Sequence, residues 1–141
     1  MSTLIADPLA KVFEREIARF VAASARQGGG RSYRNRRAAV RYHRSCPLFI
    51  ARLDDGFIED IPATLHDVST GGIGFYCDYE FPVSAILGVK LFWSEPCAPR
   101  IPVNVRHHSH TSNGILTGGQ FLIHDPLACR LIEKAPISWY G

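Results

Sequence analysis

The stretch FIEDIPATLHDVSTGGIGFYC, residues 57–77, contains two β-type runs, Phe57–His66 and Ile73–Cys77, on either side of a polar, glycine-rich turn. Short runs rich in β-branched and aromatic residues, separated by turn residues, are typical of antiparallel sheets. The same pattern extends in both directions and predicts further strands at Cys46–Leu53, Ile86–Trp93, Ile101–His107 and Ile115–Ile123. Six short strands of this kind predict an antiparallel barrel or sandwich.

Two helices flank the predicted strands. Asp7-Pro8 has the form of an N-cap followed by proline at the first helical position, and predicts a helix over about Pro8–Ala25. Asp125-Pro126 repeats the signal and predicts a short C-terminal helix that stops at Pro136. The first helix is amphipathic, and its predicted apolar face contains Leu9, Val12, Phe13, Ile17, Phe20 and Val21.

The apolar face of the first helix must be covered, and the sequence leaves three ways open. It packs on its own domain, pairs with a second copy, or docks onto a partner protein. A short heptad-like seam favours self-association as an alternative to packing on the barrel: Ala10, Phe13, Ile17, Phe20 and Ser24. The glycines Gly28–Gly30 end the helix, so we expect two parts, the helix with its linker (1–30) and a barrel domain (31–141).

Length and composition exclude several classes of protein. A chain of 141 residues that is 46% hydrophobic and 21% charged can bury one sizeable core, which argues against intrinsic disorder. No apolar run approaches the roughly 20 residues that span a bilayer, and the first residues do not resemble a secretory signal. The four cysteines lie 20 or more residues apart, so they form no close zinc-binding or redox pair. We therefore expect a cytoplasmic protein with reduced thiols.

Positive charge is concentrated in one segment. No acidic residue occurs between Glu16 and Asp54, and seven arginines lie within Arg31–Arg52. Arginine offers a planar, bidentate donor that suits phosphate groups and guanine edges. The simpler interpretation is a solvated basic segment.

Two short motifs combine to indicate a ligand site. The first is Arg37-Ala38-Ala39-Val40-Arg41, directly before the predicted barrel, and the second is Asp67-Val68-Ser69-Thr70-Gly71-Gly72, directly after a predicted strand. A carboxylate such as Asp67 can accept hydrogen bonds from the N–H groups of a guanine edge. By itself the second motif also fits an ordinary polar turn, in which Asp and Ser bond to their own backbone.

Together these motifs resemble those of the PilZ domain, a bacterial receptor module for cyclic di-GMP, whose pattern is R-x-x-x-R followed by [DN]-x-S-x-x-G. Both elements match, and the resemblance covers about residues 31–135. It implies a mainly β fold: a six-stranded antiparallel PilZ-type β-barrel with an N-terminal amphipathic helix and a short C-terminal helix. It also implies a ligand-binding set: Arg36, Arg37, Arg41, Asp67, Ser69 and Gly72.

The resemblance implies that Arg37 and Arg41 bind guanine and phosphate, and that Asp67 accepts hydrogen bonds from a guanine edge. Ser69 hydrogen-bonds nearby, Gly72 keeps the loop tight, and Arg36 helps to hold a second, stacked ligand molecule. The implied function is a non-catalytic cyclic di-GMP receptor in second-messenger signalling. It would regulate motility, adhesion or biofilm polysaccharide through a downstream protein partner. We expect the arginine-rich segment to be mobile when empty and ordered when bound.

Two other classes of function are open to a chain with these residues, a nucleic-acid binding module and a protein adaptor. A nucleic-acid binding module could use the same arginines on phosphates, but Asp67 would oppose a phosphate backbone. A PilZ-like adaptor could act through the N-terminal helix. No nucleophile elbow, Walker loop or zinc-protease motif occurs, so we expect no enzyme activity and no cofactor. The trio His107, His108 and His110 has no Cys, Asp or Glu beside it in sequence, so we expect a polar strand end rather than a metal site.

Overall fold

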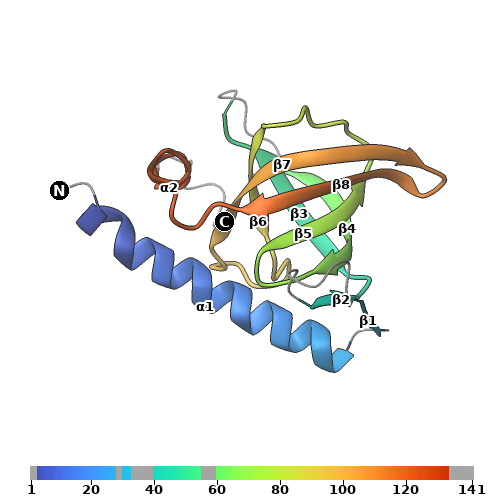
Figure 1. Cartoon of the computed structure of the whole chain (residues 1–141), viewed down its shortest axis with the longest axis horizontal. Coiled ribbons are helices and arrows are strands. Elements are labelled where there is room, and N and C mark those ends of the chain that lie inside the picture. Colours follow the sequence, from blue (N-terminus) through green and yellow to red (C-terminus); the bar gives the residue numbers. More distant parts are fainter. Residues whose placement is uncertain (1–2, 28–29, 33–39, 55–59, 134–141) are drawn as a thin grey trace.

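Six antiparallel strands form a closed barrel in the computed structural model, which describes residues 3–27, 30–32, 40–54 and 60–133 (Figure 1). Each strand pairs with two neighbours in the ring β4-β3-β6-β7-β8-β5, and the pairing of β4 with β5 closes it. This architecture confirms the fold class that the PilZ resemblance implied. The barrel strands are β3 (Pro47–Arg52), β4 (Ile61–Val68), β5 (Gly72–Cys77), β6 (Ile86–Lys90), β7 (Arg100–Thr111) and β8 (Gly114–Phe121).

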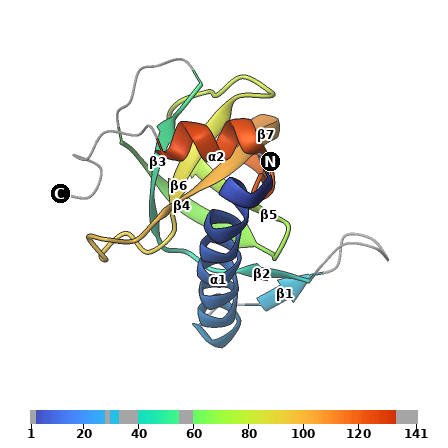
Figure 2. The same ribbon diagram turned by 90° about the vertical axis from the view of Figure 1, so that its left-hand side faces the viewer.

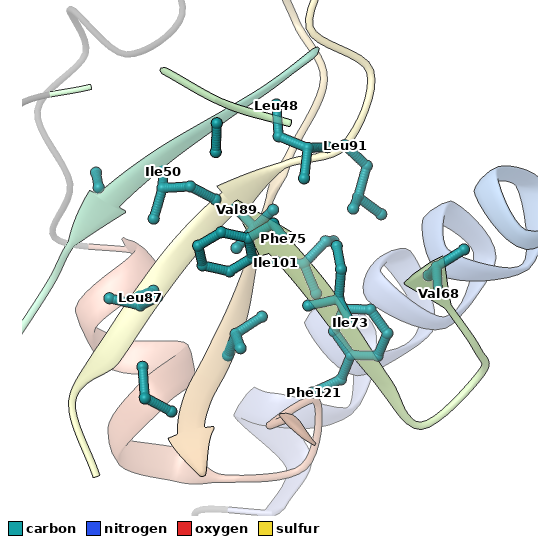
Figure 3. Packing of buried hydrophobic residues seen from close by; sticks show 14 of the residues in the cluster. Leu48, Ile50, Val68, Ile73, Phe75, Leu87, Val89, Leu91, Ile101 and Phe121 are labelled. Atoms are coloured by element: carbon teal, nitrogen blue, oxygen red, sulfur yellow. The ribbon is translucent and has the colours of Figure 1, made fainter. Parts of the chain in front are cut away.

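The interior of the barrel is an apolar core. Figure 3 shows side chains from the strands directed toward one another, among them Ile50, Phe75 and Ile101, which are fully buried. Closing the ring removes the free strand edges, so each barrel strand satisfies its backbone groups on both sides. The core therefore needs no cover at the sheet edges, and the outer face of the barrel is free to carry a site.

The strands differ from the predicted ones mainly at their ends. Strand β6 stops at Lys90 rather than at Trp93, while β7 continues past His107 to Thr111. This extension belongs to the long β7–β8 hairpin, which projects from the barrel in Figure 1. At its turn Gly114 has a φ of 115°, a conformation that glycine adopts without strain. Strand β4 reaches Val68, beyond the predicted end at His66, and the predicted residues 57–59 lie outside the described residues.

Two short strands precede the barrel and were not predicted. Strand β1 (Gly30–Ser32) pairs antiparallel with β2 (Arg41–His43), and β2 pairs with the end of β4 through Tyr42↔Val68 and His43↔Asp67. The six expected strands are those of the barrel, and β1 and β2 bring the described chain to eight. Strands of three residues carry too few positions to show a period of two. Their effect is to hold β2, which begins at Arg41, against the end of β4.

The N-terminal helix α1 (Thr3–Gln27) begins earlier than predicted. Asp7-Pro8 lies inside the helix rather than at its cap, so that part of the prediction is wrong. Proline has a φ compatible with a helix, and close to the N-terminus its missing N–H removes a single hydrogen bond, to the carbonyl of Leu4. The helix runs along the barrel, past β2, in both Figure 1 and Figure 2.

Helix α1 buries its apolar face within its own chain. Phe13, Ile17 and Phe20 belong to the same hydrophobic cluster as the barrel core. The heptad-like seam from Ala10 to Ser24 is buried at every position, whereas Val12, expected on the apolar face, is 42% exposed. A polar contact holds the outer side of the helix, because Arg19 donates to Glu95 at 2.7 and 2.9 Å. Of the three alternatives, packing on its own domain is confirmed.

The C-terminal helix α2 (Pro126–Glu133) has the predicted cap. The Asp125 carboxylate accepts from the backbone N–H groups of Leu127 at 2.9 Å and Ala128 at 3.1 Å. The predicted stop at Pro136 lies outside the described residues. Within the described residues, no helix is long and apolar enough to span a bilayer.

The four thiols differ in exposure. In the described structure all four are free cysteines, with Cys77 and Cys129 buried and Cys97 exposed. Burial raises the pKa of the Cys46, Cys77 and Cys129 thiols above its ordinary value. A raised pKa lowers the fraction of thiolate, which is the reactive form.

We therefore expect a maleimide at neutral pH to label Cys97 first and Cys77 and Cys129 far more slowly, because the last two are buried and poorly ionised. Mass spectrometry of quenched time points measures the order. The urea-unfolded chain is the control, in which all four should react at similar rates. Rapid labelling of Cys77 in the folded protein would contradict the packing described here.

Packing of α1 on the barrel predicts a large stability effect at Phe13. Phe13→Ala removes a fully buried ring and should lower the free energy of unfolding by about 3–5 kcal/mol. Val12→Ala, one position away and 42% exposed, is the matched control and should cost well under half as much. Urea denaturation of both variants measures the difference, and equal losses would mean that α1 does not pack as described.

Candidate functional site

The turn between β4 and β5 is closed by Ser69. Its Oγ accepts from the backbone N–H groups of Gly71 and Gly72, both at 3.2 Å. The Ser69 N–H donates to the Gly72 carbonyl at 2.9 Å. Ser69 is 4% exposed, and its hydroxyl holds the shape of the turn, as the simpler interpretation of this motif anticipated.

The predicted site residue Gly72 packs closely against the neighbouring strand. A Cβ atom at this position would lie 2.5 Å from the backbone oxygen of Gly119 on β8. A larger residue would therefore push β5 away from β8 at the floor of the site. The structure thus gives Gly72 a close contact between strands, and its expected part in ligand binding stays a prediction.

A β-bulge at the end of β4 directs Asp67 into the site. Leu65 pairs with Phe75 and Asp67 pairs with Gly74, so His66 is the extra residue between them. In a regular strand two consecutive side chains point to opposite faces, but a bulge re-aims them. The Asp67 carboxylate lies where a Cβ of Gly74 would be, and the absence of that Cβ gives the carboxylate its room.

The two sequence motifs meet at Asp67. Arg41, at the start of β2, places its Nη1 3.3 Å from Asp67 Oδ2, and the other carboxylate oxygen lies 3.4 Å from His66 Nδ1. Asp67 is only 5% exposed, so its charge depends on these partners and on the polar atoms of the site. Arg41 and Asp67 are 26 positions apart in sequence, and the pairing of β2 with β4 brings them together.

These residues border an open cavity of about 340 Å³ on the outer face of the barrel, a volume within the usual range for small-molecule sites. One wall contains Arg41, His66, Asp67 and Ser69, and the floor is rich in glycine. Asp67 is the sole acid among the described lining residues. The opposite wall comes from β7 and β8, through Arg106, His107 and Gln120.

Four of the six predicted site residues are therefore brought together: Arg41, Asp67, Ser69 and Gly72. Arg36 and Arg37 lie outside the described residues. Arg106 and Gln120 were not predicted from the sequence, and His107 was expected at a polar strand end rather than in a site. Arg106 and His107 lie at a bulge in β7. A bulge is defined by which residues pair across strands, so the local sequence does not indicate it.

The other two histidines of the trio, His108 and His110, contact an acid outside the cavity lining. His110 Nε2 lies 2.6 Å from Glu80 Oε1, and His108 Nδ1 lies 3.9 Å from the same oxygen. The fold brings Glu80 to these histidines from a distant segment, a neighbour that the sequence alone did not indicate. Within the residues that the structure describes, no group of three or more His, Cys, Asp or Glu side chains is arranged to hold a metal ion.

Comparisons with known proteins give similar structures but no relative by sequence. No family model matches the chain, and no curated protein matches it. Among solved structures, YcgR from Escherichia coli in complex with c-di-GMP aligns at 19% identity and a TM-score of 0.48, over 71% of this chain and 44% of that one. The K. pneumonia MrkH–c-di-GMP complex aligns at 17% identity and a TM-score of 0.44, over 71% and 50%.

The chain thus spans about half the length of these proteins. MrkH in its apo state gives 19% identity and a TM-score of 0.42, over 73% of this chain and 50% of that one. Similarity at this level assigns neither a family nor a ligand to the chain. The barrel itself is established by the strand pairing of this structure.

The hydrogen bonds of Ser69 predict that its hydroxyl maintains the turn. Ser69→Ala leaves two N–H groups, those of Gly71 and Gly72, without their acceptor and should lower the free energy of unfolding by about 1–3 kcal/mol. Thr70→Ala, at the exposed neighbouring position, is the control and should change it by less than about 0.5 kcal/mol. Thermal and urea unfolding measure both, and equal stability of the two variants would contradict this role.

Proposed function

We propose that this chain is a non-catalytic PilZ-type receptor for cyclic di-GMP, which binds in the cavity beside the β4–β5 turn. The observation that carries the proposal is the meeting of Arg41 with Asp67 at the cavity wall, 3.3 Å apart. One residue comes from the R-x-x-x-R motif and the other from the D-x-S-x-x-G motif. Arg36 and Arg37 are proposed to complete the arginine side of the site.

The Arg41–Asp67 pair supports recognition of a guanine that carries phosphate. A guanine edge presents N–H donors that a carboxylate can accept, while O6, N7 and phosphate oxygens accept from a guanidinium. In the structure the Arg41 guanidinium donates one hydrogen bond to the Asp67 carboxylate. A ligand that offers both kinds of group can replace that contact without leaving the buried Asp67 carboxylate unpaired.

The Asp67 carboxylate in the cavity wall argues against the nucleic-acid alternative. A phosphate backbone offers acceptors and negative charge, which a nearly buried carboxylate at the site opposes. Catalysis is also less favoured, because the Ser69 hydroxyl is occupied by two backbone N–H groups of the turn. Binding without reaction is the use that suits these residues best.

Helix α1 offers a route for signalling from the proposed site. Arg44, three residues after Arg41, donates to Ser24 Oγ at 3.3 Å, and its guanidinium carbon lies 5.4 Å from the centre of the Phe20 ring. The arginine-rich segment thus has one contact in the cavity wall and one on the helix. We propose that ligand binding changes the contact of Arg44 with α1 and that a downstream protein reads this change.

Calorimetry with cyclic di-GMP on the full chain tests the proposed site. The wild type should bind, and Arg37→Ala, Arg41→Gln and Asp67→Asn should each weaken binding about tenfold or more, since a good bidentate contact is worth roughly 1–3 kcal/mol. Arg130→Gln and Asp78→Asn, both exposed and outside the cavity lining, remove the same charges and should bind like the wild type. Absence of binding by the wild type would overturn the proposal.

A further inference from the structure

A second β-bulge lies across the cavity from Asp67. On β7, Val105 pairs with Gly119 and His107 pairs with Gly118, so Arg106 is the extra residue. This repeats the arrangement on β4, where His66 is the extra residue before Asp67. In both strands the bulge turns two consecutive side chains toward the same cavity: His66 with Asp67, and Arg106 with His107.

The two bulges are aligned across the barrel wall. Asp67 pairs with Gly74, Gly74 pairs with Gly118, and Gly118 pairs with His107, so these four residues form one row across β4, β5, β8 and β7. A Cβ at Gly118 would overlap the His107 imidazole ring, just as one at Gly74 would overlap the Asp67 carboxylate. Gly74 therefore leaves room for the side chain of Asp67 from β4, and Gly118 leaves room for that of His107 from β7.

The two walls differ in chemistry. The β4 wall presents the carboxylate of Asp67, whereas the described lining residues of β7 and β8 include no acid. Arg106 Nη1 donates to Gln120 Oε1 at 3.2 Å, which orients the guanidinium and leaves its other N–H groups available. A guanidinium beside an imidazole, on a wall whose described lining residues include no carboxylate, suits an anionic oxygen.

From this arrangement we propose that Arg106 and His107 form a phosphate-binding arm, opposite the guanine-binding wall of Arg41 and Asp67. The inference rests on the proposed function, since it assigns the phosphate of the same ligand to the β7 side. It places two of the residues needed for affinity outside the R-x-x-x-R and D-x-S-x-x-G motifs. Gly118 and Gln120 act as positioning residues for His107 and Arg106, respectively.

Calorimetry at low and high salt tests the arm on the full chain with cyclic di-GMP as the probe. Arg106→Gln and His107→Gln should each weaken binding about five- to tenfold in low salt. For Arg106→Gln the loss should shrink in high salt, because an exposed charge–phosphate contact is screened. Gly118→Ala keeps both side chains but displaces the imidazole, and it should weaken binding as His107→Gln does.

The controls remove the same groups elsewhere. His110→Gln, at the exposed end of the hairpin, and Arg130→Gln, on α2, should bind like the wild type. Thermal unfolding of each variant shows that it is folded. If the wild type binds and Asp67→Asn does not, while Arg106→Gln and His107→Gln bind normally, the arm is wrong and the proposed function stands.

Two other results are decisive. A loss for Arg106→Gln that is the same at both salt concentrations would overturn the phosphate assignment. Absence of binding by the wild type would overturn the proposed function and the arm together.

Discussion

The cross-strand pair Gly74–Gly118 is the constraint on which the site depends. Two strands that carry no side chain at this level leave room for groups from the strands beside them, and both flanking strands use that room. Each does so after a bulge, which turns the next side chain over the glycine rather than away from it. The cavity thus owes its polar walls to backbone geometry on β4 and β7, and its open floor to glycine on β5 and β8.

Barrel closure makes this arrangement rigid. The four strands of the row belong to one ring in which every strand is paired on both sides, and their inner faces bury a continuous apolar core. Rigid strands hold site side chains more accurately than loops do. Arg41 differs, because it is attached through the short strand β2. The site therefore combines residues fixed on barrel strands with Arg41, which lies on a short strand outside the barrel ring.

Helix α1 contacts the segment that contains Arg41 and Arg44. Its buried face is continuous with the barrel core, so the helix is a structural part of the fold in the described chain. The same helix meets Arg44 through Ser24 and Phe20, close to the residue that reaches Asp67. Arg41 and Arg44, three residues apart, thus contact the cavity wall and the buried face of α1, and this is the connection that the proposed signalling would use.

Much of the fold and half of the site were open to prediction from the sequence. The strands, the cap at Asp125 and the turn at Gly114 depend on local patterns, and the resemblance of the two motifs to those of the PilZ domain implied the convergence of Arg41 and Asp67. Tertiary structure decided the remainder: the strands β1 and β2, the burial of Phe13 against the barrel, and the β7 wall with Arg106 and His107. The reason is physical, since side-chain alternation and capping are properties of neighbouring residues. A bulge, by contrast, exists only in relation to the strand it pairs with, and that register is set by packing among distant residues.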